Sequence, residues 1–131
     1  MMLIGAAAAR AGLSVDTVRY YESQGLLTAV RQAANGRREF SEEDVAWLVF
    51  LRRMRETGMP IANLQRYVSH RAEGVGGLDG VLAVLRQHEQ SMREQRAVLD
   101  RCLDLVDNKI KKYEHLRQIG AAPGPPAVDL E

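Results

Sequence analysis

The sequence contains a single cysteine among its 131 residues and no long run of apolar residues. That one thiol, Cys102, excludes a disulfide within the chain and a multi-cysteine metal or iron–sulfur site in one copy. No stretch of about 18 or more consecutive apolar residues occurs, so no membrane span is predicted. The apolar start of the chain lacks the basic segment that opens a secretory signal peptide. We therefore expect a cytoplasmic protein with no membrane partner.

Residue patterns typical of catalytic sites are also missing. The sequence offers no paired carboxylates, no Ser/His/Asp set, no phosphate-binding loop and no metal motif. His88 and His115 are lone histidines on the predicted long helix, without a partner at ligand spacing except across a dimer. We therefore expect no enzyme, no cofactor and no metal site.

Charge is distributed unevenly along a chain whose net charge is only +1. Residues 1–71 carry ten arginines, no lysine and seven acidic residues, a net charge of +3. Residues 72–131 carry eight basic and ten acidic residues, a net charge of −2. A basic front half fits nucleic acid, and a mildly acidic rear half fits protein contacts.

The first 25 residues predict two short helices joined by a tight turn. Residues 5–11 are rich in alanine, and Gly12 ends that helix. Ser14 is a good N-cap for a second helix, which runs to about Gln24 and stops at Gly25. This is the helix-turn-helix pattern, although an ordinary helical hairpin has the same spacing.

Residues 26–40 predict a β-hairpin. Asn35-Gly36 is a strong turn signal, and it is flanked by Arg31, Arg37 and Arg38. A two-stranded wing with arginines near its tip suits contact with phosphates, and a solvated surface hairpin is the alternative interpretation.

Two more helices follow the hairpin. Ser41 and three acidic residues open a third helix of about 16 residues, whose apolar run at 45–51 predicts the centre of the domain. Gly58 ends it, and Pro60 begins a fourth helix that runs to about His70. These elements define a winged helix-turn-helix domain over residues 1–70. The glycines after it predict a linker at 71–78.

The rear of the chain predicts one long helix at residues 79–119, followed by a disordered tail at 120–131. Apolar residues recur there at alternating steps of four and three, as in a coiled coil. A lone helix of about 60 Å has nothing in its own chain to cover that stripe, so the expected partner is a second copy. Glu89 and Arg96 interrupt the stripe, and an antiparallel pair would bring their opposite charges together. The residues assigned to dimerisation are Leu82, Leu85, Met92, Leu99, Leu103, Val106 and Ile110.

The front of the chain resembles the MerR family of transcriptional regulators. The matching segments are Ile4-Gly5, Ala8-Ala9-Arg10-Ala11-Gly12-Leu13-Ser14, Thr17-Val18-Arg19-Tyr20-Tyr21-Glu22, Gly25-Leu26-Leu27, Asn35-Gly36-Arg37-Arg38-Glu39-Phe40-Ser41 and Arg55-Glu56-Thr57-Gly58-Met59-Pro60-Ile61. They span about residues 3–70, and the predicted coiled coil is a second, looser match. The short rear segment is nearest to that of the small aldehyde- and thiol-stress members.

The resemblance implies a mechanism and a set of contact residues. Family members bind as dimers to promoters with an overlong spacer and bend and untwist it for RNA polymerase, at a cost in DNA deformation. Antiparallel dimerisation helices place the two reading heads at successive major grooves. The second helix then reads DNA and the wing contacts phosphates. For Tyr21 a core position is equally compatible. The implied DNA-binding residues are Ser14, Val15, Asp16, Thr17, Arg19, Tyr20, Tyr21, Arg37 and Arg38. Further candidate contacts to the DNA backbone are Arg52, Arg53, Arg66 and Arg71.

The sensing chemistry of related members is not evident. Arg53 stands where the thiol-stress members carry a reactive cysteine, and Cys102 is expected to be a small buried residue on the long helix. A small-molecule effector could instead bind between head and coiled coil, lined by Trp47, Met54, Tyr67 and Tyr113.

Two other functions fit parts of the pattern. An excisionase-like architectural DNA-binding protein shares the winged head but not the long helix, and footprinting on a promoter would separate the two. A coiled-coil adaptor would bind protein through its head. Unchanged DNA binding after Arg19→Ala and Arg38→Ala would favour the adaptor.

Overall fold

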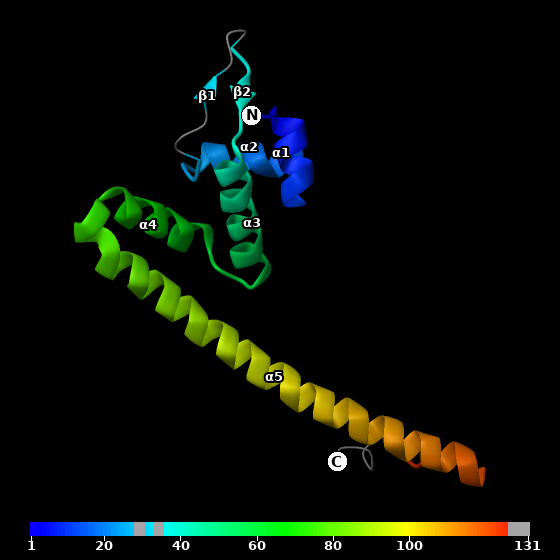
Figure 1. Cartoon of the computed structure of the whole chain (residues 1–131). Coiled ribbons are helices and arrows are strands. Elements are labelled where there is room, and N and C mark those ends of the chain that lie inside the picture. The colour runs from blue at the N-terminus through cyan, green and yellow to red at the C-terminus, as the bar shows by residue number, and fades with distance from the viewer. Residues whose placement is uncertain (28–30, 33–35, 126–131) are drawn as a thin grey trace. The chain divides into compact units, whose positions relative to one another are not determined.

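The computed structural model describes residues 1–27, 31–32 and 36–125, with only the backbone described at 31–32 (Figure 1). In chain order the elements are α1 (Ile4–Ala11), α2 (Val15–Ser23), β1 (Arg31–Gln32), β2 (Arg38–Glu39), α3 (Glu42–Glu56), α4 (Ile61–Ala72), the 3₁₀ helix η1 (Gly74–Gly77) and α5 (Leu78–Ile119). The predicted fold class, mainly helical with a small hairpin and a long C-terminal helix, is confirmed. No described helix combines the length and apolar character that crossing a membrane requires.

The chain divides into two compact units, residues Met1–His88 and Glu89–Glu131. We call the first unit the head. It extends well past residue 70, because the first turns of α5 cover part of its core: Val84 and His88 are both buried there.

Helices α1 and α2 are separated by a three-residue turn that begins at Gly12. Gly12 has a φ of 74°, a left-handed conformation that favours glycine, and its amide donates to the carbonyl of Ala9. The Ser14 hydroxyl accepts a hydrogen bond from the Thr17 amide at 3.0 Å and so caps α2. The turn predicted from sequence is therefore built by the expected residues.

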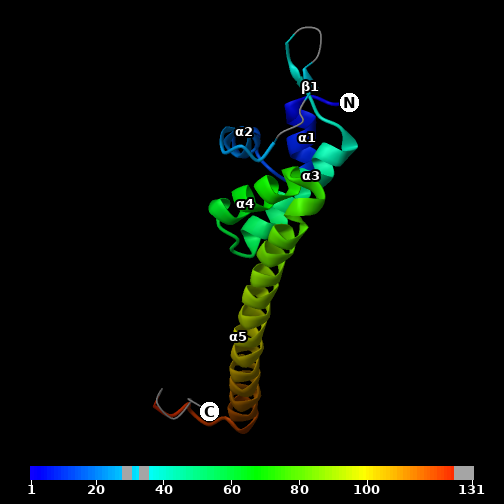
Figure 2. The ribbon, with the colours of Figure 1, turned by 90° about the vertical axis from the view of Figure 1, so that its left-hand side faces the viewer.

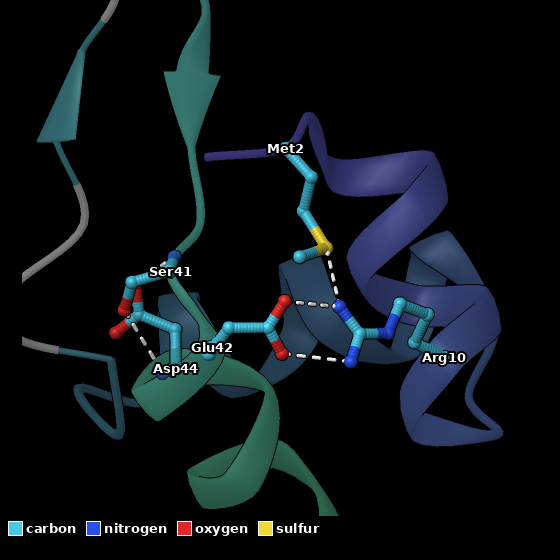
Figure 3. Close-up of polar contacts among 5 residues, drawn as sticks. All are labelled: Met2, Arg10, Ser41, Glu42 and Asp44. Atoms are coloured by element: carbon cyan, nitrogen blue, oxygen red, sulfur yellow. Dashed lines mark hydrogen bonds and ion pairs between the residues drawn. The ribbon is translucent and has the colours of Figure 1, made fainter.

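Helix α3 runs through the centre of the head. Its first turn has a capping box, in which Ser41 and Asp44 each bond the other's backbone amide, at 3.1 and 2.8 Å (Figure 3). Within its apolar run, Val45, Leu48 and Leu51 are buried, whereas Trp47, Val49 and Phe50 are half-buried and Ala46 is exposed, so the run is only partly covered in the single chain. The buried apolar core of the head consists of Ala7, Ala8, Ala11, Val18, Tyr21, Leu26, Phe40, Val45, Leu48, Leu51, Met59, Leu64 and Val84.

The wing is a two-stranded antiparallel hairpin in which Arg31 pairs with Glu39 and Gln32 with Arg38. The predicted turn residue Asn35 lies outside the described residues, while Gly36 has a φ of 80°. At the base of the wing, Met2 and Phe40 exchange two backbone hydrogen bonds of 2.6 and 2.9 Å. The Phe40 side chain is fully buried, so it packs at the wing base.

The segment predicted as a linker, residues 71–78, is instead helical over most of its length. Helix α4 continues to Ala72, and η1 leads directly into α5. Gly77 is buried, and a Cβ there would lie 1.7 Å from the carbonyl oxygen of His70. Gly77 thus allows the end of α4 and the start of α5 to approach each other closely. Figure 2 looks onto the side of the head that carries α4, whose Tyr67 stacks on Trp47 of α3.

The second unit consists of α5 from Glu89 onward and the residues after it. Residues 121–125 form neither helix nor strand, and the rest of the predicted tail, 126–131, lies outside the described residues. The predicted stripe on this part of the helix is largely exposed in the single chain. Its exposed members include Leu99, Leu103, Val106, Ile110 and Tyr113.

Candidate nucleic-acid interface

The outward face of α2 carries three polar or aromatic side chains that point away from the core. Asp16, Arg19 and Tyr20 are all exposed, and their spacing of three and four residues places them on one face of the helix. Ser14 and Thr17 shape the start of the helix, since the Ser14 hydroxyl also donates to the Thr17 hydroxyl at 2.9 Å. Val15 is half-buried against the core. The surface available for recognition therefore consists of Asp16, Arg19 and Tyr20, together with the exposed residues Ser14 and Ser23 at the two ends of the helix.

The two adjacent tyrosines of α2 have different environments. Tyr20 is 48% exposed, whereas Tyr21 is only 5% exposed and belongs to the core. Burial raises the pKa of the Tyr21 hydroxyl above its usual value of 10.0, so this phenol stays neutral at physiological pH. Of the two roles that the sequence leaves open for Tyr21, the structure favours packing.

The wing arginine Arg38 forms an ion pair with Glu22 of α2. Sequence reasoning missed this role of Glu22, because the partners are 16 residues apart and no local pattern connects them. Arg37 is exposed on the same hairpin. The ion pair joins α2 and the wing into one surface.

The other candidate arginines have partners within the head. Arg52 donates from Nη1 to the carbonyl oxygen of Ala11 at 3.0 Å, so it caps the end of α1 rather than facing outward. It also lies 2.9 Å from the Glu56 carboxylate. Of the others, Arg53 pairs with Glu56 at 3.3 Å, Arg66 donates to Asn63 at 2.7 Å, and Arg71 lies 6.0 Å above the Trp47 ring. Arg52 therefore joins α1 to α3 within the head, and its predicted DNA contact stays a prediction.

The residues predicted to bind an effector are only partly brought together. Trp47 and Tyr67 stack at 5.6 Å between ring centroids, and Phe50 lies within 5.3 Å of both rings. Met54 packs against the same core, whereas Tyr113 belongs to the second unit. Cys102 is exposed in the single chain, and its expected burial on the long helix stays a prediction because no second copy is present. The effector site therefore remains a prediction.

The residues assigned to dimerisation are divided between the two units. Leu82 and Leu85 lie on the part of α5 within the head, where Leu82 is exposed and Leu85 half-buried. Met92 is half-buried in the second unit, and the other four, Leu99, Leu103, Val106 and Ile110, are exposed there.

Helices α1 and α3 are joined by an ion pair at the surface of the head. Arg10 holds both carboxylate oxygens of Glu42, at 2.5 and 2.7 Å, with the sulfur of Met2 beside the same guanidinium (Figure 3). The hydrogen bonds from Arg10 lower the pKa of Glu42 below its usual value of 4.5. A lowered folded-state pKa stabilises the fold above the unfolded-state pKa, and this contribution is lost as the pH falls through the folded-state pKa.

Glu42→Gln is therefore expected to lower the stability of the head slightly at neutral pH. The difference from the wild type should shrink as the pH falls through the lowered folded-state pKa of Glu42, because the wild-type carboxylate then becomes protonated. Urea unfolding at a series of pH values measures it. Glu43→Gln, an exposed change in the same helical turn, is the control. If the difference in unfolding free energy between the variant and the wild type persisted unchanged below the folded-state pKa, it would contradict a stabilising ion pair.

Comparison with known proteins supports a regulatory role. Residues 2–71 match the model of the MerR HTH family regulatory proteins. An uncharacterised HTH-type transcriptional regulator of Haemophilus influenzae is 30% identical, with the match covering 88% of this chain and 85% of the relative.

Solved structures agree with this match. A MerR family regulator from Listeria monocytogenes superimposes with a TM-score of 0.85 at 32% identity and covers 92% of each chain. HiNmlR, described as a MerR family regulator that lacks the sensor domain and is bound to promoter DNA, gives a TM-score of 0.80 at 28% identity, over 91% of this chain and 94% of the other.

Proposed function

This chain belongs to the MerR family of helix-turn-helix transcriptional regulators, and from this premise we propose that two copies of it bind one promoter and control transcription there. Helix α2 reads the major groove, and the wing holds phosphates beside it. The observation that carries the proposal is the single surface formed by α2 and the wing. Its exposed residues include Asp16, Arg19, Tyr20, Arg37 and Arg38.

Two copies are needed because the second unit exposes an apolar stripe. Leu99 and Leu103 are 61% and 65% exposed in the single chain. Side chains of this size stabilise an interface by about 1.5–3 kcal/mol each when fully buried. A second copy of the same helix offers a matching stripe, and an antiparallel arrangement would place Glu89 of each chain near Arg96 of the other.

The dimer would act on DNA shape as well as on sequence. Two heads held by one coiled coil contact two half-sites, and bending the spacer between them costs a few kcal/mol of DNA deformation. Contacts from both helices and both wings offset that cost. We propose that this deformation makes an overlong promoter spacer usable by RNA polymerase, and that the protein therefore acts in the cytoplasm, where the bacterial chromosome lies.

Arg19→Ala tests DNA recognition. Arg19 is exposed on the outward face of α2, and its loss should weaken binding by roughly tenfold or more, within the usual range of about 1–3 kcal/mol for one base contact. Fluorescence anisotropy on the duplex upstream of the protein's own gene measures the affinity.

Arg101→Ala is the matched control for this test. It removes the same charge from an exposed site in the second unit, outside the DNA-reading surface, and should leave the affinity nearly unchanged. Equal binding by Arg19→Ala and the wild type would remove α2 from the reading role. A footprint on phased recombination sites instead of a promoter palindrome would favour the architectural alternative.

A further inference from the structure

We propose that Glu22 is a positioning residue for DNA binding. It holds the wing arginine Arg38 against the reading helix, so that the guanidinium is already in position when a DNA phosphate arrives. This inference rests on the proposed function and assigns to it a residue that contacts no DNA itself. It begins from the ion pair between Glu22 of α2 and Arg38 of β2.

The geometry allows Arg38 to bind the Glu22 carboxylate and a DNA phosphate at the same time. Its Nη1 atom engages one carboxylate oxygen of Glu22, Oε2. A guanidinium carries five N–H donors in a planar fork, so donors remain for an anion beyond the carboxylate. The Arg38 side chain is 42% exposed, whereas that of Glu22 is 25% exposed. The acid is thus the more enclosed, anchoring partner, and the arginine is the one that solvent, or a phosphate, can reach.

The wing needs such an anchor because it is short. Each described strand has only two residues, and an isolated two-stranded hairpin is marginally stable in water. The backbone bridge between Met2 and Phe40 holds its base. The ion pair with Glu22 holds β2, the strand that follows the tip. Because Arg38 is held in place before DNA arrives, less side-chain conformational entropy is lost in the binding step.

Charge and positioning predict opposite signs for the loss of Glu22. A carboxylate beside the DNA-binding surface repels the phosphates, so its removal should tighten binding if charge were its main effect. If Glu22 positions Arg38, its removal should weaken binding although a negative charge has been lost. The sign of the change therefore separates the two explanations.

The experiment compares Glu22→Gln, Arg38→Ala and the double variant on two duplexes. One is the DNA upstream of the protein's own gene, and the other is a random-sequence duplex of about 40 base pairs, roughly four helical turns. Affinity is measured by anisotropy over a series of salt concentrations. Each phosphate contact contributes about −0.9 to the slope of log affinity against log salt. Circular dichroism and thermal melting establish that each variant is folded.

We expect Glu22→Gln to weaken binding to the upstream duplex by about fivefold to tenfold, the range of one charge-assisted contact. The slope of log affinity against log salt should become less steep by up to about 0.9, the value of one phosphate contact, in this variant and in Arg38→Ala. The double variant should be no weaker than Arg38→Ala, because Glu22 acts through that arginine. Glu22→Asp, which keeps the charge on a shorter side chain, should fall between Glu22→Gln and the wild type.

Glu43→Gln is the control for charge, since it removes an exposed carboxylate of the head outside the ion pair. Binding of Glu22→Gln as tight as the wild type, or tighter, would overturn the inference and leave the proposed function intact. Additive losses in the double variant would do the same. Failure of the wild-type protein to bind either duplex at low salt would overturn the proposed function, and this inference with it.

Discussion

Leu103→Asp is expected to convert the dimer into monomers. Leu103 is 65% exposed in the single chain and lies mid-way along the apolar stripe of the second unit. The substitution removes about 1.5–3 kcal/mol of apolar burial from each chain and places a carboxylate in the seam, where charge is costly to desolvate. Both copies carry the change, so the dissociation constant of the dimer should rise by about a thousandfold or more, roughly 4 kcal/mol.

Sedimentation velocity at micromolar concentration would show the change directly. Binding to the upstream duplex should fall with it, because a single head loses the second half-site. Asn108→Asp adds the same carboxylate at an exposed position on the polar face of α5 and should remain dimeric. A Leu103→Asp protein that still sedimented as a stable dimer would mean that the stripe is not the interface.

Gly77→Ala is expected to destabilise the head, whereas Gly76→Ala one residue earlier should not. A Cβ at Gly77 would lie 1.7 Å from the carbonyl oxygen and 2.6 Å from the carbonyl carbon of His70. These are backbone atoms, so the end of α4 and the start of α5 must shift. Overpacking of this kind costs typically about 1–3 kcal/mol, and we expect a value at the upper end.

Gly76→Ala is the control, because it is not expected to lower the stability of the head. A Cβ there meets nothing within 4 Å, and its φ is not in the left-handed region. Alanine should therefore be neutral or stabilise by up to about 1 kcal/mol, because it reduces the freedom of the unfolded chain. Thermal melting should separate the two variants by several degrees. Equal melting temperatures would show that the α4–α5 junction is a loose linker, as the glycine content of residues 71–78 first indicates.

Local patterns predicted most helix limits within about two residues. Gly12, Ser14 and Ser41 act on backbone groups within a few positions of themselves, so their effects can be read along the chain. The alternating steps of four and three predicted a helix from residue 79, and α5 begins at Leu78. The expected roles of Arg19 and Tyr20 are compatible with their exposed positions, and they stay predictions until DNA binding is measured.

By itself, the sequence determined the order of the helices, the wing, the long apolar stripe and the family, because each depends on residues close together in the chain. The tertiary structure decided which of two adjacent tyrosines is buried, that Arg52 caps α1, that Arg38 is held by Glu22, and that glycine permits close packing at residue 77. Ion pairs and contacts between residues 16 to 41 positions apart exist only after the helices have packed, so no local pattern specifies them.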